Sequence, residues 1–277
     1  MKRVVLQMIG VVFALYGYAQ TDGSVPLVPG QSTSANAGNY RLTIDTKFCD
    51  LNGRIQSHQI TDWKINHLSY LSPVDNSFRL EEVCLTEING QERNTRKLDE
   101  LEGLNVAILN DNFTKADFYK DIPAAYVSIF RTFVQDKVGI AVPVQLYIGS
   151  LELNVPFYPS FFQNQQADFE NDVSFTNQKM SVTWLGYSKI NGKDCYLVQF
   201  GSMFNPFRSE DAMTATNGRS CYWVNVWILP DTQQIEYAVM YEDIVSVTKL
   251  KSDDTERQNY IQREVKYEII VPQVQKK

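Results

Sequence analysis

Residues 182–200 read VTWLGYSKINGKDCYLVQF, and this stretch decides the fold class. Asn191 and Gly192 both tolerate positive φ, which a two-residue type I′ hairpin turn requires at both central positions. Pairing Ile190 with Lys193 then fixes the register of an antiparallel hairpin. This register places Tyr187 opposite Tyr196, Leu185 opposite Val198 and Thr183 opposite Phe200. Because these six side chains share one largely apolar face, the turn and the core pattern agree.

A second hairpin is predicted directly downstream. Residues 221–229, CYWVNVWIL, lead into the turn-forming stretch PDTQ at 230–233, and residues 234–247 return. Trp223, Trp227 and Leu229 alternate with a second apolar set, so the strand at 221–229 is apolar on both faces. Such a strand should be covered on both faces. Strands at 193–202 and 220–229 are expected to be antiparallel neighbours.

Further strands flank the two hairpins. Residues 40–48 alternate apolar and polar side chains, which predicts a half-buried strand. Weaker strands are predicted at 58–69 and 77–88, and Asn89-Gly90 can turn the second of them back. Residues 261–271 alternate cleanly, with Val265, Tyr267, Ile269 and Val271 on the inward face. The stretch KLKSDDTERQN at 249–259 is interpreted as a charged, solvated loop.

One helical region interrupts the strands. Thr114 to Asp117 matches a capping box, and a stronger helix is expected after Asp121, with Pro123 in its first turn. Gly139 is the expected stop. An apolar stripe at helical spacing, which should pack against the sheet, comprises Tyr126, Ile129, Phe130, Phe133 and Val134. We therefore expect a mainly β (α+β) fold with a helix over 123–138.

The N-terminal segment predicts export. Lys2 and Arg3 precede an apolar run, and small residues at Gly17 and Ala19 suit a leader-peptidase site. The run is shorter than the about 20 residues of a membrane span, which favours cleavage near Ala19 over a retained anchor. We expect a signal peptide at 1–19, a flexible linker at 20–38 and a single β-rich domain at 39–277. No transmembrane span is expected in the mature chain, which would be periplasmic or extracellular.

Composition argues against several functions. The formal charge of −6 offers no basic surface for nucleic acid, so no nucleic-acid partner is expected. His58 and His67 are nine residues apart on one predicted strand, which places them on opposite faces and does not suit a shared metal site. No zinc-protease, P-loop, dinucleotide or nucleophile-elbow motif is present. We therefore predict a non-enzymatic protein with no catalytic residues, no metal and no cofactor.

The four cysteines leave their state open. Cys49, Cys84, Cys195 and Cys221 allow three pairings in an oxidising compartment, and buried free thiols are the alternative. If 193–202 and 220–229 pair, Cys195 and Cys221 lie near opposite ends of the strand pair. They would then be farther apart than the Cα limit of about 7 Å for a disulfide.

An aromatic, proline-containing stretch precedes the hairpins. Residues 155–169 read VPFYPSFFQNQQADF, in which Pro156 and Pro159 discourage a central strand. Its aromatic side chains suit a lid or docking loop for an apolar ligand. The alternative, that they pack onto the core, follows from the general role of aromatic residues in burial, and it is favoured.

The hairpins at 182–200 and 221–247 resemble those of LolA-like envelope proteins, a superfamily that includes LolA, LolB and LppX-type proteins. The resemblance is carried by Gly186, Asn191-Gly192, the run Lys193–Val198 and Trp227-Ile228. It implies a strongly curved antiparallel half-barrel with a helical plug on its concave face, where members of the superfamily bind acyl chains. No ligand-binding motif of the superfamily transfers to individual residues of this chain.

Three functions follow from these patterns. A carrier of a lipid or other hydrophobic ligand would use aromatic side chains near the helix and the aromatic stretch, and the candidates are Phe130, Phe133, Phe157, Tyr158, Phe161 and Trp227. A structural or interaction module of the cell envelope would have a solid core and an envelope protein as its partner. A hydrolase would need His58 or His67 beside an acid and a nucleophile.

Overall fold

The computed structural model describes residues 38–72, 75–110, 112–169, 173–210, 212–252 and 255–270. The predicted leader at 1–19, residues 20–37 of the predicted linker and Val271 lie outside these ranges. Within them the protein is mainly β, with one open, curved antiparallel sheet and one α-helix, as the sequence predicts.

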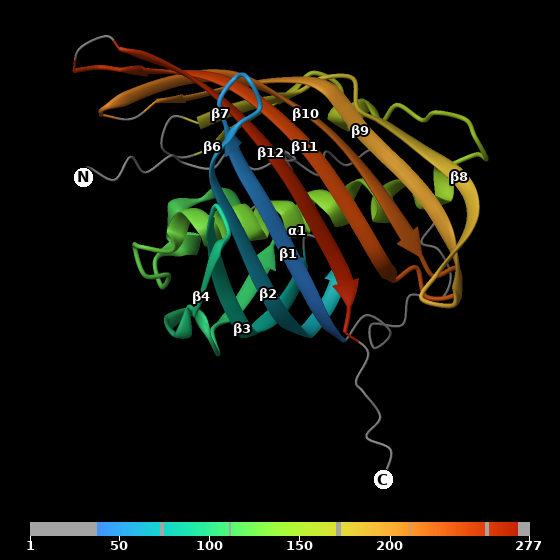
Figure 1. Ribbon diagram of the computed structural model, residues 1–277. Helices are drawn as coiled ribbons and strands as arrows, with labels where there is room; N and C mark the ends of the chain where they lie inside the picture. The colour runs from blue at the N-terminus through green and yellow to red at the C-terminus, as the bar shows by residue number, and fades with distance from the viewer. Residues whose placement is uncertain are drawn as a thin grey trace.

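Twelve strands of the described chain join in this sheet (Figure 1). Their bounds are β1 Asn39–Cys49, β2 Ile55–Ser72, β3 Asp75–Asn89, β4 Glu92–Lys97, β5 Asn105–Leu109, β6 Gln165–Phe169, β7 Val173–Asn177, β8 Ser181–Ile190, β9 Lys193–Glu210, β10 Thr214–Ile228, β11 Ile235–Leu250 and β12 Glu256–Ile269. The spatial order is β4-β3-β2-β1-β12-β11-β10-β9-β7-β6, with β5 paired to β3 and β8 paired to β9. The first strand therefore lies beside the last at the centre of the sheet.

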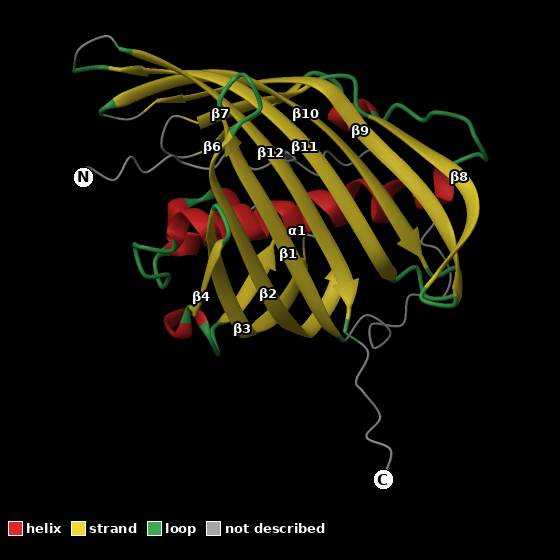
Figure 2. Cartoon of the chain, viewed as in Figure 1, coloured by secondary structure: helices red, strands yellow, loops and turns green. Residues whose placement is uncertain are grey.

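The only α-helix in the described ranges, α1 (Val127–Tyr147), runs along the concave side of this sheet (Figure 2). Short 3₁₀ helices lie at Asp99–Leu101, Asn112–Thr114, Ala116–Tyr119, Ile148–Ser150 and Ser160–Phe162. Buried side chains of α1 and of the concave face form one hydrophobic cluster. The expected arrangement, a curved sheet with a helical plug, is confirmed.

The predicted helix differs from α1 at both ends. The helix begins at Val127 rather than near Pro123, and it passes Gly139 and Pro143 before it ends at Tyr147. The predicted capping box does not form, since the 3₁₀ helix there begins after Lys115 without a side-chain cap. Burial explains the longer C-terminal part, because the segment beyond Gly139 still places apolar side chains in the core. These side chains are Ile140, Val142 and Val144.

The hairpin at 182–200 has the predicted turn but not the whole predicted register. Asn191 and Gly192 have φ of 52° and 76°, and Ile190 pairs with Lys193. Beyond Gly186, which has φ of 112°, a β-bulge leaves Leu185 without a partner. Glycine permits this bulge because it reaches positive φ without a Cβ clash. As a result Trp184 lies opposite Val198 and Val182 opposite Phe200, which corrects the pairings predicted for Leu185 and Thr183.

The second hairpin also forms where predicted, and β9 and β10 are antiparallel neighbours. The expectation that β10 is covered on both faces is wrong, since Trp223 on the convex face is 38% exposed. Trp223 stacks on Tyr241 of the adjacent strand, so same-face aromatic neighbours shield it. The charged stretch at 249–259 is mostly strand rather than loop, because β11 continues to Leu250 and β12 begins at Glu256.

The state of the cysteines is resolved by the fold. Cys49 and Cys195 are buried, Cys84 and Cys221 are partly buried, and all four are free. Cys195 lies at the start of β9 and Cys221 midway along β10, beyond the residues that pair with that start. The argument against a Cys195–Cys221 disulfide is therefore confirmed.

Gly201 of β9 is a position where a side chain has no room. A Cβ built on Gly201 would lie 2.5 Å from the backbone oxygen of Tyr222. We expect Gly201→Ala to destabilise the fold by about 1–3 kcal/mol, because the backbone of β10 must move to accept the methyl group. Urea unfolding should show this as a lower midpoint at an unchanged slope.

The matched control is Gln199→Ala, two residues earlier on β9, where the side chain is exposed. Its effect should stay within about 0.5 kcal/mol, as is usual for surface positions. Equal midpoints for the two variants would contradict the close approach of β9 and β10.

Candidate functional site

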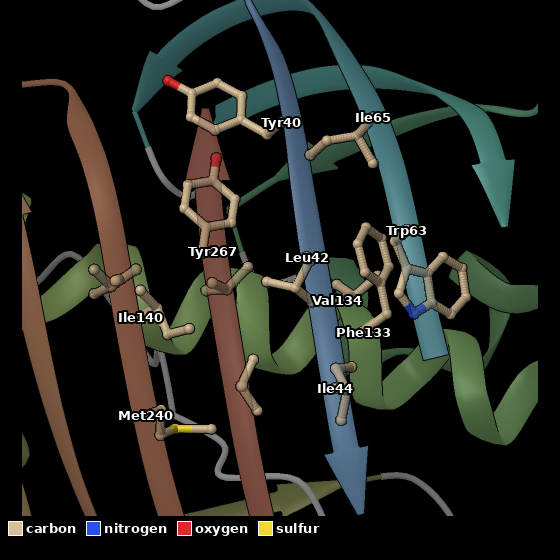
Figure 3. Packing of buried hydrophobic residues seen from close by; sticks show 14 of the residues in the cluster. Tyr40, Leu42, Ile44, Trp63, Ile65, Phe133, Val134, Ile140, Met240 and Tyr267 are labelled. Atoms are coloured by element: carbon tan, nitrogen blue, oxygen red, sulfur yellow. The ribbon is translucent and has the colours of Figure 1, made fainter. Parts of the chain in front are cut away.

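Phe130 and Phe133 of α1 lie inside an aromatic cluster between the helix and the sheet. Figure 3 shows Phe133 beside Trp63. The Phe133 ring stacks on Trp63 of β2 at 4.3 Å between centroids, and Phe78 of β3 meets its edge at 5.8 Å. Phe130 and Phe133 are 1% and 0% exposed. Neighbouring rings therefore cover the two side chains that the sequence suggested for a ligand.

The aromatic stretch at 155–169 does not stay together in the fold: Phe157 lies against the outer edge of β8, whereas Gln165–Phe169 forms β6 and pairs with β7. Phe157 exchanges two backbone hydrogen bonds with Val182, and its ring lies 5.3 Å from that of Tyr147 at the end of α1. Phe162 is buried, which agrees with the packing alternative, whereas Tyr158 is 60% exposed. The side chain of Phe161 lies outside the described set. Only Phe157 among these candidates is placed beside the helix and partly open.

Trp227 lies on the convex face, away from α1. Its indole Nε1 donates to Ser188 Oγ at 3.2 Å, and its ring packs on Tyr237 at 5.5 Å. The structure therefore does not bring Trp227 together with Phe130, Phe133 or Phe157.

A small polar pocket lies between the C-terminal half of α1 and the sheet. Lys137, Ala141 and Gln145, spaced one helical turn apart, form its helix side. Four strands supply the other wall, which consists of Tyr40, His67, Ile235 and Tyr267. The free space is close to the size of one water molecule. Figure 3 shows two of these side chains, Tyr40 and Tyr267, one above the other on β1 and β12.

Lys137 is the most unusual residue of this pocket. It is 4% exposed, and its ammonium donates to Asn76 Oδ1 at 2.9 Å and lies 4.8 Å from the centre of the Phe78 ring. Among the described residues no carboxylate pairs with it. Burial lowers the pKa of Lys137 to about 7, because the charged form loses its hydration. A buried ionisable group with a perturbed pKa beside a pocket is typical of a functional site.

A second buried charge cluster lies on another side of α1. Arg263 of β12 contacts Asp136 of α1 and Glu242 of β11, and Glu242 also accepts a hydrogen bond from Ser220 at 2.5 Å. Burial raises the pKa of Asp136 to about 7, although Arg263 opposes the shift. Asp136 Oδ1 and Arg263 Nε have no hydrogen-bond partner among the described atoms. We call Asp136, Glu242 and Arg263 the ion triad.

Sequence reasoning missed both features. Asp136 and Lys137 fall outside the apolar stripe of the helix, so they read as solvent-facing residues. The strands that approach α1 from several directions bury them, and that arrangement is long-range. The one local signal was the alternation of β12, which places Arg263 on the inward face with Val265 and Tyr267.

The two histidines lie on opposite faces of β2, as predicted. His58 is hydrogen-bonded to Asp45 Oδ1 at 2.8 Å on the convex side, whereas His67 is buried beside Tyr40. Within the described ranges, no three His, Cys, Asp or Glu side chains are grouped as metal ligands would be. None of the helices described is long and apolar enough to cross a bilayer.

Comparison with known proteins finds only distant structural likenesses. No protein-family model and no curated protein sequence matches the chain. A lipovitellin structure concerned with lipid–protein interactions is 14% identical over 84% of this chain, with a TM-score of 0.37. This chain spans 25% of that lipovitellin chain.

Two bacterial structures are also similar. A DUF1329 family protein from Desulfovibrio piger is 9% identical over 85% of this chain and 87% of its own, with a TM-score of 0.20. An outer membrane lipoprotein-sorting protein domain from Vibrio parahaemolyticus is 6% identical over 87% and 91%, with a TM-score of 0.17. At these scores the likenesses carry no inference about function.

Proposed function

We propose that this protein is an exported, non-enzymatic binding or carrier protein for a hydrophobic ligand, related to the LolA-like proteins. The ligand would lie between α1 and the concave face of the sheet. After cleavage near Ala19 the protein would work in the periplasm or outside the cell.

The observation that carries the proposal is the set of buried polar groups in the middle of α1. Thr132, Gln135, Asp136 and Lys137 are all buried there, although apolar residues would hold a permanent plug at least as well. Lys137 also borders a pocket, and pockets that join apolar walls to a few convergent polar groups are typical ligand sites.

The packing of α1 indicates which half of the helix would yield to a ligand. The N-terminal half is filled by the aromatic cluster around Phe133. Toward the C-terminal end Val142 and Val144 are still buried, but other apolar side chains are only partly buried, and they are Ala141, Leu146, Tyr147 and Ile148. An acyl chain would bind there, with Phe157 beside it. In this proposal Phe130 and Phe133 form the closed end of the site, and Tyr158 and Phe161 remain proposed contacts on its more exposed side. Trp227, on the convex face, lies outside this site.

Binding can be tested with the purified mature protein. We expect organic extraction and native mass spectrometry to recover bound acyl chains, and a fluorescent fatty acid to bind and be displaced by unlabelled lipid. Ala141→Phe should weaken binding by about tenfold or more, because the added ring occupies the space beside Lys137 and Gln145. Tyr187→Ala, at an exposed aromatic residue of β8 that is not a proposed contact, should bind like the wild type.

The competing function is a structural or interaction module of the cell envelope that binds no small molecule. The tight aromatic packing around Phe133 favours it, since that half of the interface leaves no room for a ligand. A correctly folded protein that carries no acyl chain and binds no fluorescent fatty acid would overturn the carrier proposal and support the module.

A further inference from the structure

The pocket beside Lys137 has a positive charge that no carboxylate of the described residues pairs with. Lys137 and Arg263 are the buried lysine and arginine of the described chain. Arg263 contacts two carboxylates, Asp136 and Glu242, so its positive charge already has negative partners. Lys137 has only a neutral amide, Asn76, and an aromatic face, Phe78. An anion entering this side of α1 would therefore find its complement at Lys137.

The other polar groups of the pocket suit an oxygen ligand. Tyr40 Oη accepts a hydrogen bond from Gln234 Nε2, which leaves its own hydroxyl hydrogen to be donated. The Tyr40 ring stacks on Tyr267 at 4.8 Å and lies 5.0 Å from the His67 ring, so neighbouring rings hold it in position. Tyr40 and Lys137 thus present two donors to one small space.

The size of the pocket selects among anions. The free space is close to that of one water molecule, and a carboxylate oxygen can replace a water with only small shifts of the side chains around it. A phosphate group carries more oxygens and would need a larger opening. The apolar walls, Ala141 and Ile235, continue toward the partly buried end of α1, where a hydrocarbon tail would lie.

We propose that the ligand is a long-chain monocarboxylate whose carboxylate binds Lys137 and Tyr40 in this pocket. This inference rests on the proposed function and names the ligand class for the same site. Binding involves no covalent step: the ammonium of Lys137 and the hydroxyl of Tyr40 donate hydrogen bonds to the two carboxylate oxygens. The bound anion also favours the protonated amine, which burial alone disfavours.

The test compares dodecanoate with dodecanol, which has the same tail and no charge, by isothermal titration at pH 6.5. A hydrogen-bonded charge is worth about 10- to 100-fold in affinity, so we expect the wild type to prefer dodecanoate by that factor. Lys137→Met keeps most of the unbranched side chain and removes the charge. It should reduce the preference to within about threefold and leave the affinity for dodecanol unchanged.

Each result separates the two proposals. Equal wild-type affinities for acid and alcohol would overturn the carboxylate inference and leave the proposed function standing. No binding of either compound would overturn both. A folded Lys137→Met protein that keeps the full acid preference would overturn the role of Lys137. The wild-type comparison requires no variant, so the inference stays falsifiable even if Lys137→Met does not fold. Lys120→Met, at an exposed lysine that pairs with the exposed Asp117 outside the pocket, is the control and should keep the acid preference.

Discussion

Replacing Arg263 with methionine is expected to destabilise the fold by about 3–5 kcal/mol, because it leaves two carboxylates buried without their cation. Asp136 and Glu242 are 0% and 2% exposed, so water cannot take the place of the guanidinium. The loss should be visible at neutral pH as a large fall in the urea midpoint. Because Arg263 joins α1 to two strands, the variant should also lose protection of α1 against amide hydrogen exchange.

Lys266→Met is the matched control for Arg263→Met. Lys266 lies three residues away on β12, is half exposed and pairs only with Glu264. Exposed ion pairs contribute about 0–1 kcal/mol, so the control should unfold close to the wild type. If the two variants lost the same stability, the ion triad would not anchor α1.

The pH dependence of stability provides a further check on the ion triad. A carboxylate whose folded pKa is raised binds more protons in the folded state, so its contribution is present below the unfolded pKa and is lost as pH rises. For Asp136 that loss spans from about pH 4 to about 7, and burial raises the pKa of Glu242 in the same direction. Asp136→Asn should flatten the decline in stability over this window.

Lys137 acts in the opposite sense at higher pH. Its pKa is lowered to about 7, so its contribution is present above the unfolded value of about 10.4 and is lost as pH falls toward 7. The combined contribution of Asp136 and Lys137 to the free energy of unfolding should therefore be smallest near neutral pH. Urea unfolding of the wild type and of Asp136→Asn between pH 5 and pH 9 measures it.

The second large effect is expected at Phe133. Phe133→Ala should cost about 3–5 kcal/mol, since it removes a fully buried ring from between Trp63 and Phe78 and leaves a cavity. The thermal midpoint should fall by many degrees, and near-ultraviolet circular dichroism should lose signal from Trp63, which stacks on the missing ring.

Tyr158→Ala is a suitable comparison, because it deletes an aromatic side chain that is 60% exposed. Its effect should stay within about 0.5 kcal/mol. A small loss at Phe133, similar to that at Tyr158, would mean that α1 is not packed in the concave face as described.

Local patterns in the sequence were sufficient for most of the sheet. The Asn191-Gly192 turn and the alternation in 40–48 and 261–271 depend on nearby residues, and each led to the right element. The bulge at Leu185 was missed, because an extra residue interrupts the alternation of the strand. It depends on the positive φ of Gly186, which a residue with a Cβ rarely adopts. The end of α1 was placed too early, since burial of Ile140 and Val144 outweighs the low helix propensity of Gly139 and Pro143.

The candidate site was less predictable for a physical reason. Aromatic side chains in a sequence indicate burial but not which buried surface they fill, so Phe133 and Trp227 were grouped although they lie on opposite faces of the sheet. Asp136 and Lys137 were invisible as site residues, because their burial depends on strands from both ends of the chain. Only the tertiary arrangement reveals a lysine without a counter-ion.

The pairing of β1 with β12 sets the order in which the molecule can assemble. The sheet has a gap at its middle until β12 has been made, so two half-sheets keep open edges until that strand is available. The ion pair of Asp136 forms equally late, because its partner Arg263 belongs to β12. Contacts this distant in sequence slow folding. Until β12 docks, both half-sheets present unpaired strand edges, and such edges make a folding intermediate prone to aggregation.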